Sequence, residues 1–417
     1  MKINKIVVSL FTAGLMASPL ANATNGYFSH GYGMKAKGMA GVGIALPQDS
    51  IAAATNPAGM VWVGDRIDLG VDWFRPSRGA EITGNSFGAD GTYDGNGRSN
   101  FLIPELGFNK MMNPDMSLGV SVYGNGGMNT DYHTNPFGAF GGSGNAGVDL
   151  QQLFISPTWA MKLNPQHSIG VAINLVYQTF RADGLQPFAN TPGFSSDPSA
   201  VTNNGKDTST GVGLKLGWTG ELTSALTMGA TYQPKTKMKK FSKYAGLFAE
   251  QGGFDIPATY GVGLALKATP QTTLAIDYQA IQYSGVPSIA NTLSAGGQLG
   301  ADNGPGFGWK NVNVVKFGVS QAMSGTLTVR AGYSHNTQPI PESQTFFNIL
   351  APGVVQDHVT LGATWNVSPQ NEVTVAYMHA FEKKVNGSGS IPASFGGGEA
   401  NLHMYENSLG VAFSWKM

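Results

Sequence analysis

The stretch Ser168-Ile169-Gly170-Val171-Ala172-Ile173-Asn174-Leu175 alternates between small or polar side chains and bulky apolar ones. Successive side chains of a β-strand point to opposite faces, so a period of two predicts a strand. A strand of about ten residues crosses a bilayer at a tilt, with a bulky face toward lipid and a small or polar face toward the lumen. The pattern therefore predicts an all-β membrane fold, a transmembrane β-barrel.

Short turns of similar sequence join pairs of such alternating segments. The turns are Asn113-Pro114-Asp115, Asn164-Pro165-Gln166, Thr269-Pro270-Gln271 and Ser368-Pro369-Gln370. Long polar stretches separate one pair from the next. Short turns at one end and long loops at the other are typical of barrels in the bacterial outer membrane.

The number of alternating segments is even, as single-chain bacterial barrels require. We expect fourteen antiparallel strands, near 65–75, 101–112, 116–124, 150–163, 166–184, 208–221, 224–236, 256–269, 272–286, 311–321, 324–338, 353–368, 371–385 and 401–417. Six short and seven long connections place both barrel ends on the periplasmic side. A soluble β-sandwich is the alternative, and it predicts more charge and no such asymmetry.

The composition supports a wall that faces hydrocarbon. Charged residues make up only 12% of the chain and the formal net charge is zero, whereas about a quarter of the residues of a soluble domain are charged. The lack of a basic field argues against nucleic-acid binding. The chain has no Cys and 58 Gly, many within strand-like runs. No disulfide framework or thiolate metal site is therefore expected.

The N-terminal residues read as an export signal. Lys2 and Lys5 precede a short apolar run, Ile6 to Met16, and Ala21-Asn22-Ala23 fits a cleavage site. We expect a signal peptide over 1–23; an N-terminal anchor is the alternative. No other segment approaches the ~20 apolar residues of a spanning helix.

Residues 24–64 are rich in Gly and Ala and do not alternate. A fourteen-stranded barrel encloses more space than wall side chains fill. We therefore expect 24–64 to be a hatch that plugs the lumen of a barrel over 65–417. A flexible periplasmic arm is the alternative.

Several motifs resemble the FadL/OmpP1/TodX family of outer-membrane transporters for long-chain fatty acids and other hydrophobic compounds. The likeness is carried by Gly26-Tyr27-Phe28, Gly38-Met39-Ala40-Gly41, Ala45, Asp49 and the intact hatch motif Asn56-Pro57-Ala58. It continues through Leu118-Gly119-Val120-Ser121, Phe140-Gly141-Gly142 and the strand pair up to Arg181, and it fades in the later loops. The family barrel also has fourteen strands.

The resemblance implies a route for apolar cargo. Extracellular loops capture the ligand, an apolar pocket gated by the hatch receives it, and an inward-bent strand releases it sideways through the barrel wall. The bent strand corresponds best to 116–124, where Gly124, Gly126 and Gly127 mark a kink or simply begin a loop. Long-chain fatty acids are the expected cargo. The alternatives are aromatic or alkane hydrocarbons, or a general diffusion porin.

The candidate ligand contacts are aromatic or apolar residues of the hatch and of long loops. They are Tyr27, Phe28, Phe137, Phe140, Leu153 and Phe248. Apolar residues in long exposed loops indicate a capture groove, although packing of the plug or of loop on loop also explains them. The basic run from Lys235 to Lys243 meets lipopolysaccharide or a carboxylate, or is an ordinary solvated loop.

The sequence does not indicate an enzyme. None of the seven histidines lies in a nucleophile elbow or in His-x-x-x-His spacing, so no catalytic residue, metal or cofactor is expected. Of these, His335, His358, His379 and His403 are expected to cluster in the lumen. The expected partners are a hydrophobic ligand, outer-membrane lipid and lipopolysaccharide, and the barrel-assembly machinery. We expect a monomer in the outer membrane.

Overall fold

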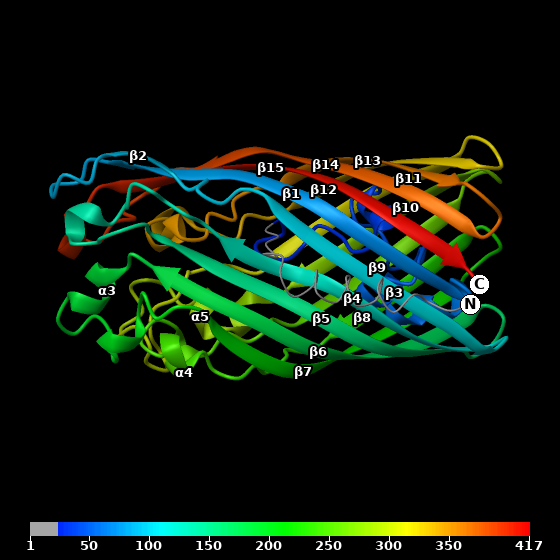
Figure 1. Cartoon of the computed structure of the whole chain (residues 1–417), viewed down its shortest axis with the longest axis horizontal. Helices are drawn as coiled ribbons and strands as arrows, with labels where there is room; N and C mark the ends of the chain where they lie inside the picture. Colours follow the sequence, from blue (N-terminus) through cyan, green and yellow to red (C-terminus); the bar gives the residue numbers. More distant parts are fainter. Residues whose placement is uncertain (1–23) are drawn as a thin grey trace, which may run out of the picture.

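A computed structural model describes residues 24–417, so the expected signal peptide lies outside the described residues. The chain forms one antiparallel sheet that closes on itself (Figure 1). Its strands are β1 (Arg66–Thr83), β2 (Gly91–Asp94), β3 (Phe101–Asn113), β4 (Met116–Asn129), β5 (Gly147–Lys162), β6 (His167–Asp183), β7 (Asp207–Glu221), β8 (Leu226–Gln233), β9 (Thr259–Lys267), β10 (Thr272–Ile281), β11 (Val312–Ala322), β12 (Leu327–Asn336), β13 (Asp357–Asn366), β14 (Asn371–Val385) and β15 (Glu399–Lys416).

The barrel closes between its first and last strands. β1 pairs with β15 over their whole length, from Arg66 opposite Lys416 to Thr83 opposite Glu399. The short β2 pairs only with the outer part of β1. Within the described residues fourteen strands therefore form the wall and one strand is extra, which confirms the expected fourteen-stranded barrel.

The tight turns are built by side chains that cap their own backbone. Asn113 Oδ1 accepts the amide of Asp115, and Asn164 Oδ1 accepts those of Gln166 and His167. Asparagine favours turns because its side chain bonds to the backbone two residues on. The C-terminus lies at this end, and helices α3, α4 and α5 lie in the long loops at the opposite end (Figure 1).

The alternating faces lie as predicted. On β6, Ile173, Leu175 and Tyr177 are 43–48% exposed toward the lipid side. Ala172 and Asn174, which alternate with them, are fully buried on the lumen side. The apolar outer surface agrees with a wall that contacts hydrocarbon.

Short helices lie in the loops and in the N-terminal segment. They are α2 (Met34–Lys37), η1 (Ala52–Ala54), η2 (Pro57–Trp62), η3 (Gly138–Phe140), α3 (Gln186–Asn190), η4 (Pro198–Ala200), η5 (Ser242–Tyr244), α4 (Ala249–Gly252), η6 (Tyr283–Gly285), α5 (Pro287–Ala290), η7 (Glu342–Gln344), η8 (Phe347–Ile349) and η9 (Ala393–Phe395). Within residues 24–417, none is long and apolar enough to cross a membrane.

Residues 24–65, the luminal segment, lie inside the barrel (blue in Figure 1). Nearly all of residues 24–61 are buried. Helices η1 and η2 pack against β4 and β5, and α2 packs against β13 and β14. The segment therefore contacts opposite parts of the wall.

Candidate functional site

Wall glycines make room for the luminal segment. A Cβ on Gly362 of β13 would come within 2.9 Å of the Gly38 Cα, and a Cβ on Gly170 of β6 would overlap the backbone of Pro57. Glycine suits a strand where another backbone approaches closely. Contact with the luminal segment thus explains several of the glycines within strand-like sequence runs.

Carboxylates of the wall hold backbone amides of this segment. Glu105 of β3 accepts the amides of Gly33 and Met34 at 3.1 and 3.0 Å. Asp277 of β10 accepts those of Gly43 and Ile44 at 2.8 and 3.0 Å. Hydrogen bonds to an ionised acceptor are about twice as strong as neutral ones. These bonds give partners to buried amides of an irregular backbone, which has no sheet ladder to pair them.

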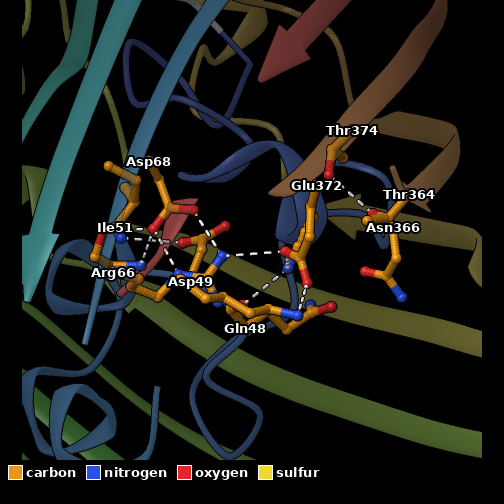
Figure 2. A network of polar contacts seen from close by, with 12 residues as sticks. Gln48, Asp49, Ile51, Arg66, Asp68, Thr364, Asn366, Glu372 and Thr374 are labelled. Carbon is orange, nitrogen blue, oxygen red and sulfur yellow. Dashed lines mark hydrogen bonds and ion pairs between the residues drawn. The ribbon is translucent and has the colours of Figure 1, made fainter. Parts of the chain in front are cut away.

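A charged network ties the segment to the barrel seam (Figure 2). Lys35 Nζ lies 2.5 Å from Glu372 of β14, which also pairs with Lys416 of β15. Arg66 of β1 lies 2.7 Å from Asp68 and 3.3 Å from Glu372. Because buried charges are costly unless paired, removing one member would leave its partners uncompensated. The network joins the segment to the strands that close the barrel.

Asp49 lies in the same network and is almost fully buried. Its Oδ1 accepts the amide of Ile51 at 3.0 Å. Burial, aided by the nearby carboxylate of Asp68, raises the pKa of Asp49 to about 6. Burial also holds the pKa of His30 well below its usual range. Burial therefore shifts the titration of both groups toward their neutral forms, and His30 is neutral at ordinary pH.

The Asn56-Pro57-Ala58 motif joins two parts of the segment to the wall. Asn56 Nδ2 donates to the carbonyls of Ile44 at 2.7 Å and Trp218 at 3.0 Å. Its Oδ1 accepts the amide of Ala58 at 3.1 Å and caps η2, with Pro57 in the first turn. Both residue types suit the start of a helix. The motif is therefore a structural clasp.

Tyr27 and Phe28 form the surface of the luminal segment that faces the extracellular half of the lumen. Their rings stack with centroids 5.1 Å apart, and both side chains are buried. Tyr283 Oη donates to the Asn25 carbonyl at 2.6 Å, and its ring lies 5.3 Å from that of Tyr27. The Trp309 ring lies 6.1 Å from Tyr27. The segment thus presents an aromatic platform toward the extracellular half of the lumen.

A continuous series of ring contacts leads from the loops to this platform. The centroid distances run from Phe140 to Phe346 (5.8 Å), Phe188 (6.1 Å), Phe347 (5.5 Å), Phe307 (5.2 Å), Trp309 (6.2 Å) and Tyr27 (6.1 Å). Aromatic side chains bury large apolar areas and attract one another at such distances. A continuous row of packed rings, the ring path, therefore extends from the outer loops to the luminal segment.

Strand β4 carries a bulge at the platform. Its register with β5 shifts between Gly124 and Gly126, which leaves Asn125 as an extra residue. Phe28 forms a β-bridge with Gly126, and the Gly127 amide donates to the Tyr27 carbonyl at 2.9 Å. Bulges bend a strand and end its regular pairing. Here residues 123–128 of β4 are all buried, next to the luminal segment.

The ladder between β3 and β4 covers only their periplasmic halves. Its outermost pair is Leu106 with Val122. Beyond it, residues 101–105 of β3 pair with β1, and residues 123–129 of β4 pair with β5. In the described strands this leaves the two facing edges without a shared ladder. Strand edges without ladder bonds present unpaired backbone groups and are not held together by hydrogen bonds between the strands.

The cavities differ in polarity. One beside Trp309, of about 20 Å³, is lined by Met128, Met404 and Arg78. Another, of about 350 Å³, is polar and lies at the loop ends of β4–β6, lined by residues that include Arg98 and Arg181. The larger cavity is not lined by any ring of the ring path, so the row of apolar rings and the polar cavity are separate features.

The predicted ligand residues separate in space. Phe137 and Phe140 join the loop end of the path, and Phe248 lies in a second cluster, 4.9 Å from Phe254. Leu153 was expected in the loop groove, but it lies within β5 opposite Gly124, on the outer face. The expected strand over 150–163 already contained Leu153, so the strand prediction is confirmed at this residue and its assignment to the loop groove was wrong.

The other polar candidates also lie away from the path. Lys239, Lys240 and Lys243 of the basic run are exposed. Only His358 of the four expected luminal histidines is buried on the inner row of its strand. The other three, His335, His379 and His403, lie on the outer row of their strands, because the residues on either side of each are the buried, inward-facing ones.

Some path residues were missed by sequence reasoning. They are Phe188, Phe307, Trp309, Phe346 and Phe347. The adjacent pair Phe346-Phe347 within a long loop was the available signal, because consecutive aromatic residues lack a solvent-facing role.

The closed apolar-faced barrel with an occupied lumen defines a transmembrane β-barrel of the outer membrane. The sequence matches the family described as "Outer membrane protein transport protein (OMPP1/FadL/TodX)" over residues 16–391, so the chain belongs to this family. The long-chain fatty acid transport protein of Shigella flexneri is 23% identical over 436 residues, which covers 91% of this chain and 94% of the relative. That of Escherichia coli K12 is 23% identical over 434 residues, with the same coverage.

Solved structures share the fold. A Pseudomonas aeruginosa FadL homologue superposes with a TM-score of 0.72 at 16% identity, covering 94% of this chain and 99% of that one. The Pseudomonas putida toluene transporter TodX gives a TM-score of 0.68 at 16% identity, with the same coverage.

Proposed function

We propose that this chain carries hydrophobic molecules, foremost long-chain fatty acids, across the outer membrane. The continuous ring path from Phe140 to Tyr27 carries this proposal. An apolar path spares a greasy cargo the cost of hydration, about 0.8 kcal/mol per CH₂. The relatives named as long-chain fatty acid transport proteins support the choice of cargo.

In this mechanism the loops capture the cargo and the aromatic platform receives it. The luminal segment acts as the hatch, and its movement at Tyr27 and Phe28 opens the way to β4. The cargo then leaves sideways between β3 and β4, where the ladder is missing. Lateral release delivers the molecule into the membrane without exposure to water. Outer-membrane lipid and lipopolysaccharide surround the barrel, and the assembly machinery inserts it.

Uptake by cells that lack other such transporters tests the proposal. Cells expressing the chain should accumulate labelled palmitate, and liposomes containing it should not swell in small sugars. Free sugar permeation at porin-like rates would contradict the proposal and favour a diffusion porin. A hydrocarbon cargo is the second candidate, supported by the toluene transporter of the same fold; uptake of toluene without palmitate would favour it.

Deletion of residues 24–60 tests the hatch itself. The barrel should fold, leak small solutes and deliver palmitate poorly, because the segment fills the lumen. Unchanged conductance would contradict a plug.

A further inference from the structure

Exposed lysines gather at the extracellular end of β7 and in the loop between β8 and β9. The members of this lysine patch are Lys206, Lys235, Lys237, Lys239, Lys240 and Lys243. The whole chain has 25 basic residues and no net charge. The patch is therefore a strong local excess of positive charge on a neutral protein.

The segment after β8 continues the barrel wall as an extended chain. Gly211 of β7 forms an antiparallel bridge with Met238. Thr236 and Met238 are 1% and 9% exposed, so their side chains face inward. Successive side chains of an extended chain point to opposite faces. The residues that alternate with them, on the outer face of the wall, are Lys235, Lys237 and Lys239.

This outward row begins where the apolar outer face of β7 ends. By the register of the Gly211 bridge, Lys237 lies opposite Val212, whose side chain is 67% exposed. One step farther from the membrane, the Lys239 amide donates to the Thr210 carbonyl at 2.9 Å. The outer face therefore changes from apolar to polar at this height.

Two tyrosines mark the membrane interface below the lysine patch. Tyr232 of β8 and Tyr260 of β9 are paired in the sheet, and each is nearly half exposed. Aromatic rings with a polar tip are enriched at the level of the lipid head groups. Lys237 follows Tyr232 by five residues, and an extended chain rises about 3.3 Å per residue. The lysines therefore stand at or just above the head groups of the outer leaflet.

The protein itself leaves part of this charge unmatched. Lys235 Nζ lies 3.6 Å from a carboxylate oxygen of Asp255. The carboxylate of Asp207 accepts the backbone amides of Thr208 at 2.8 Å and Lys243 at 2.9 Å. Among residues 24–417, the lysines of the patch that have no carboxylate within 4 Å include Lys206, Lys237 and Lys239.

Basic side chains near the gap between β3 and β4 are matched by carboxylates instead. Arg98 lies 3.9 Å from Asp131 and 3.6 Å from Asp149. Arg181 lies 2.5 Å from Asp183. An anion would meet these carboxylates there. The lysine patch begins at β7, three strands farther along the sheet from β4, and is the better match for an anion.

We propose that Lys206, Lys237 and Lys239 bind the phosphates of lipopolysaccharide, the phosphorylated glycolipid of the outer leaflet. An ammonium group binds phosphate as a point charge. Lys237 and Lys239 lie on one face about 7 Å apart, which suits the several phosphate oxygens of one head group. The acyl chains of the same molecule lie along the apolar row that ends at Val212. This inference goes beyond transport: it assigns a lipid-anchoring face at β7 and β8, away from the gap between β3 and β4.

Two lipids with the same acyl chains test the site. Diphosphoryl lipid A and lipid A without its phosphates are titrated by native mass spectrometry onto the detergent-solubilised full-length mature protein, as wild type and as K206Q/K237Q/K239Q. Glutamine keeps a donor and removes the charge. We expect the wild type to bind the diphosphoryl lipid about tenfold more tightly, because each lysine near an anionic lipid surface adds to the attraction. The triple variant should bind both lipids equally, and added salt should weaken the preference of the wild type.

A matched control separates the patch from net charge. K310Q/K383Q/K384Q removes three positive charges from the extracellular ends of other strands and should keep the preference. Gel mobility before and after heating reports how much of each variant is a folded barrel. Inorganic phosphate at millimolar concentration should not displace the lipid, since it lacks the acyl chains.

Three outcomes would overturn the proposal. The first is equal affinity of the wild type for both lipids, and the second is the same loss of preference in both triple variants. The third is displacement of the lipid by inorganic phosphate, which would assign the lysines to a free anion. Palmitate uptake does not enter any of these readouts, so their failure would leave the proposed transport function untouched.

Discussion

Phe28 and Gly126 form an antiparallel β-bridge that joins the luminal segment to the barrel wall. The bridge lies next to the bulge of β4, at the height where β4 no longer pairs with β3. The bridge thus connects the backbone of the aromatic platform to the strand whose edge lacks a ladder. Movement of the platform is therefore coupled directly to the wall at the proposed exit.

Gly126→Ala should weaken this bridge. A Cβ at Gly126 would overlap the Tyr27 carbonyl oxygen, and overpacking of this kind costs about 1–3 kcal/mol. We expect faster hydrogen exchange of the amides of residues 24–30. Gly138→Ala is the control, because a Cβ there meets no atom within 4 Å. Equal exchange in both variants would show that the bridge does not hold the segment.

Asn56→Ala should loosen the clasp of the luminal segment. The change leaves the buried carbonyls of Ile44 and Trp218 without this donor, at about 1–3 kcal/mol for each buried group left unsatisfied. We expect larger and more frequent conductance events in planar bilayers. Asn113→Ala, in an exposed turn, should leave conductance unchanged. Unchanged conductance of the Asn56 variant would mean that the motif is not needed to keep the luminal segment in place.

Phe307 connects the two ends of the ring path, because its ring lies between those of Phe347 and Trp309. Phe307→Asn places a polar amide in the path, where burial without a partner costs about 1–3 kcal/mol. Palmitate uptake should fall, whereas Phe307→Leu should keep most of it because the path stays apolar. Similar uptake by both variants, at equal amounts in the membrane, would place the cargo route elsewhere.

Asp49 should make the seating of the luminal segment depend on pH. Burial raises the pKa of its carboxyl to about 6, so the seated segment favours the protonated form. The stability that the protonated carboxyl adds to the seated segment is fully present below about pH 4, the ordinary pKa of aspartate. It is lost as the pH rises through 6. Asp49→Asn should remove that dependence and increase protection from hydrogen exchange over 33–60 at neutral pH. If protection from exchange in Asp49→Asn still falls between acidic and neutral pH as it does in the wild type, another group causes the pH dependence.

The barrel was largely predictable because a period of two is a local signal. The expected strands match the observed ones within a few residues, except where strands extend beyond the membrane. β1 continues to Thr83, well past the expected 75, because its outer half pairs with β15 above the lipid. No local pattern marks that extension, since Arg75, Ser77 and Glu81 on its outer row lack the apolar character of a spanning segment.

The site was less predictable because its members come from separate loops. Phe188, Phe307 and Phe346 meet only after three loops fold over one another. Leu153 was assigned to the loop groove although it lay inside the expected strand 150–163, and its parity places it on the outer row of β5.

Lateral exit between β3 and β4 is tested most directly by deleting Asn125 and measuring the rate of palmitate uptake by cells. Removing the extra residue takes out the bulge in the ladder between β4 and β5. We expect the straightened β4 then to continue its ladder with β3 beyond Leu106 and Val122. We predict that the folded barrel still binds palmitate and that uptake falls to the level of cells without the protein. Uptake at the wild-type rate through such a straightened wall would contradict the account.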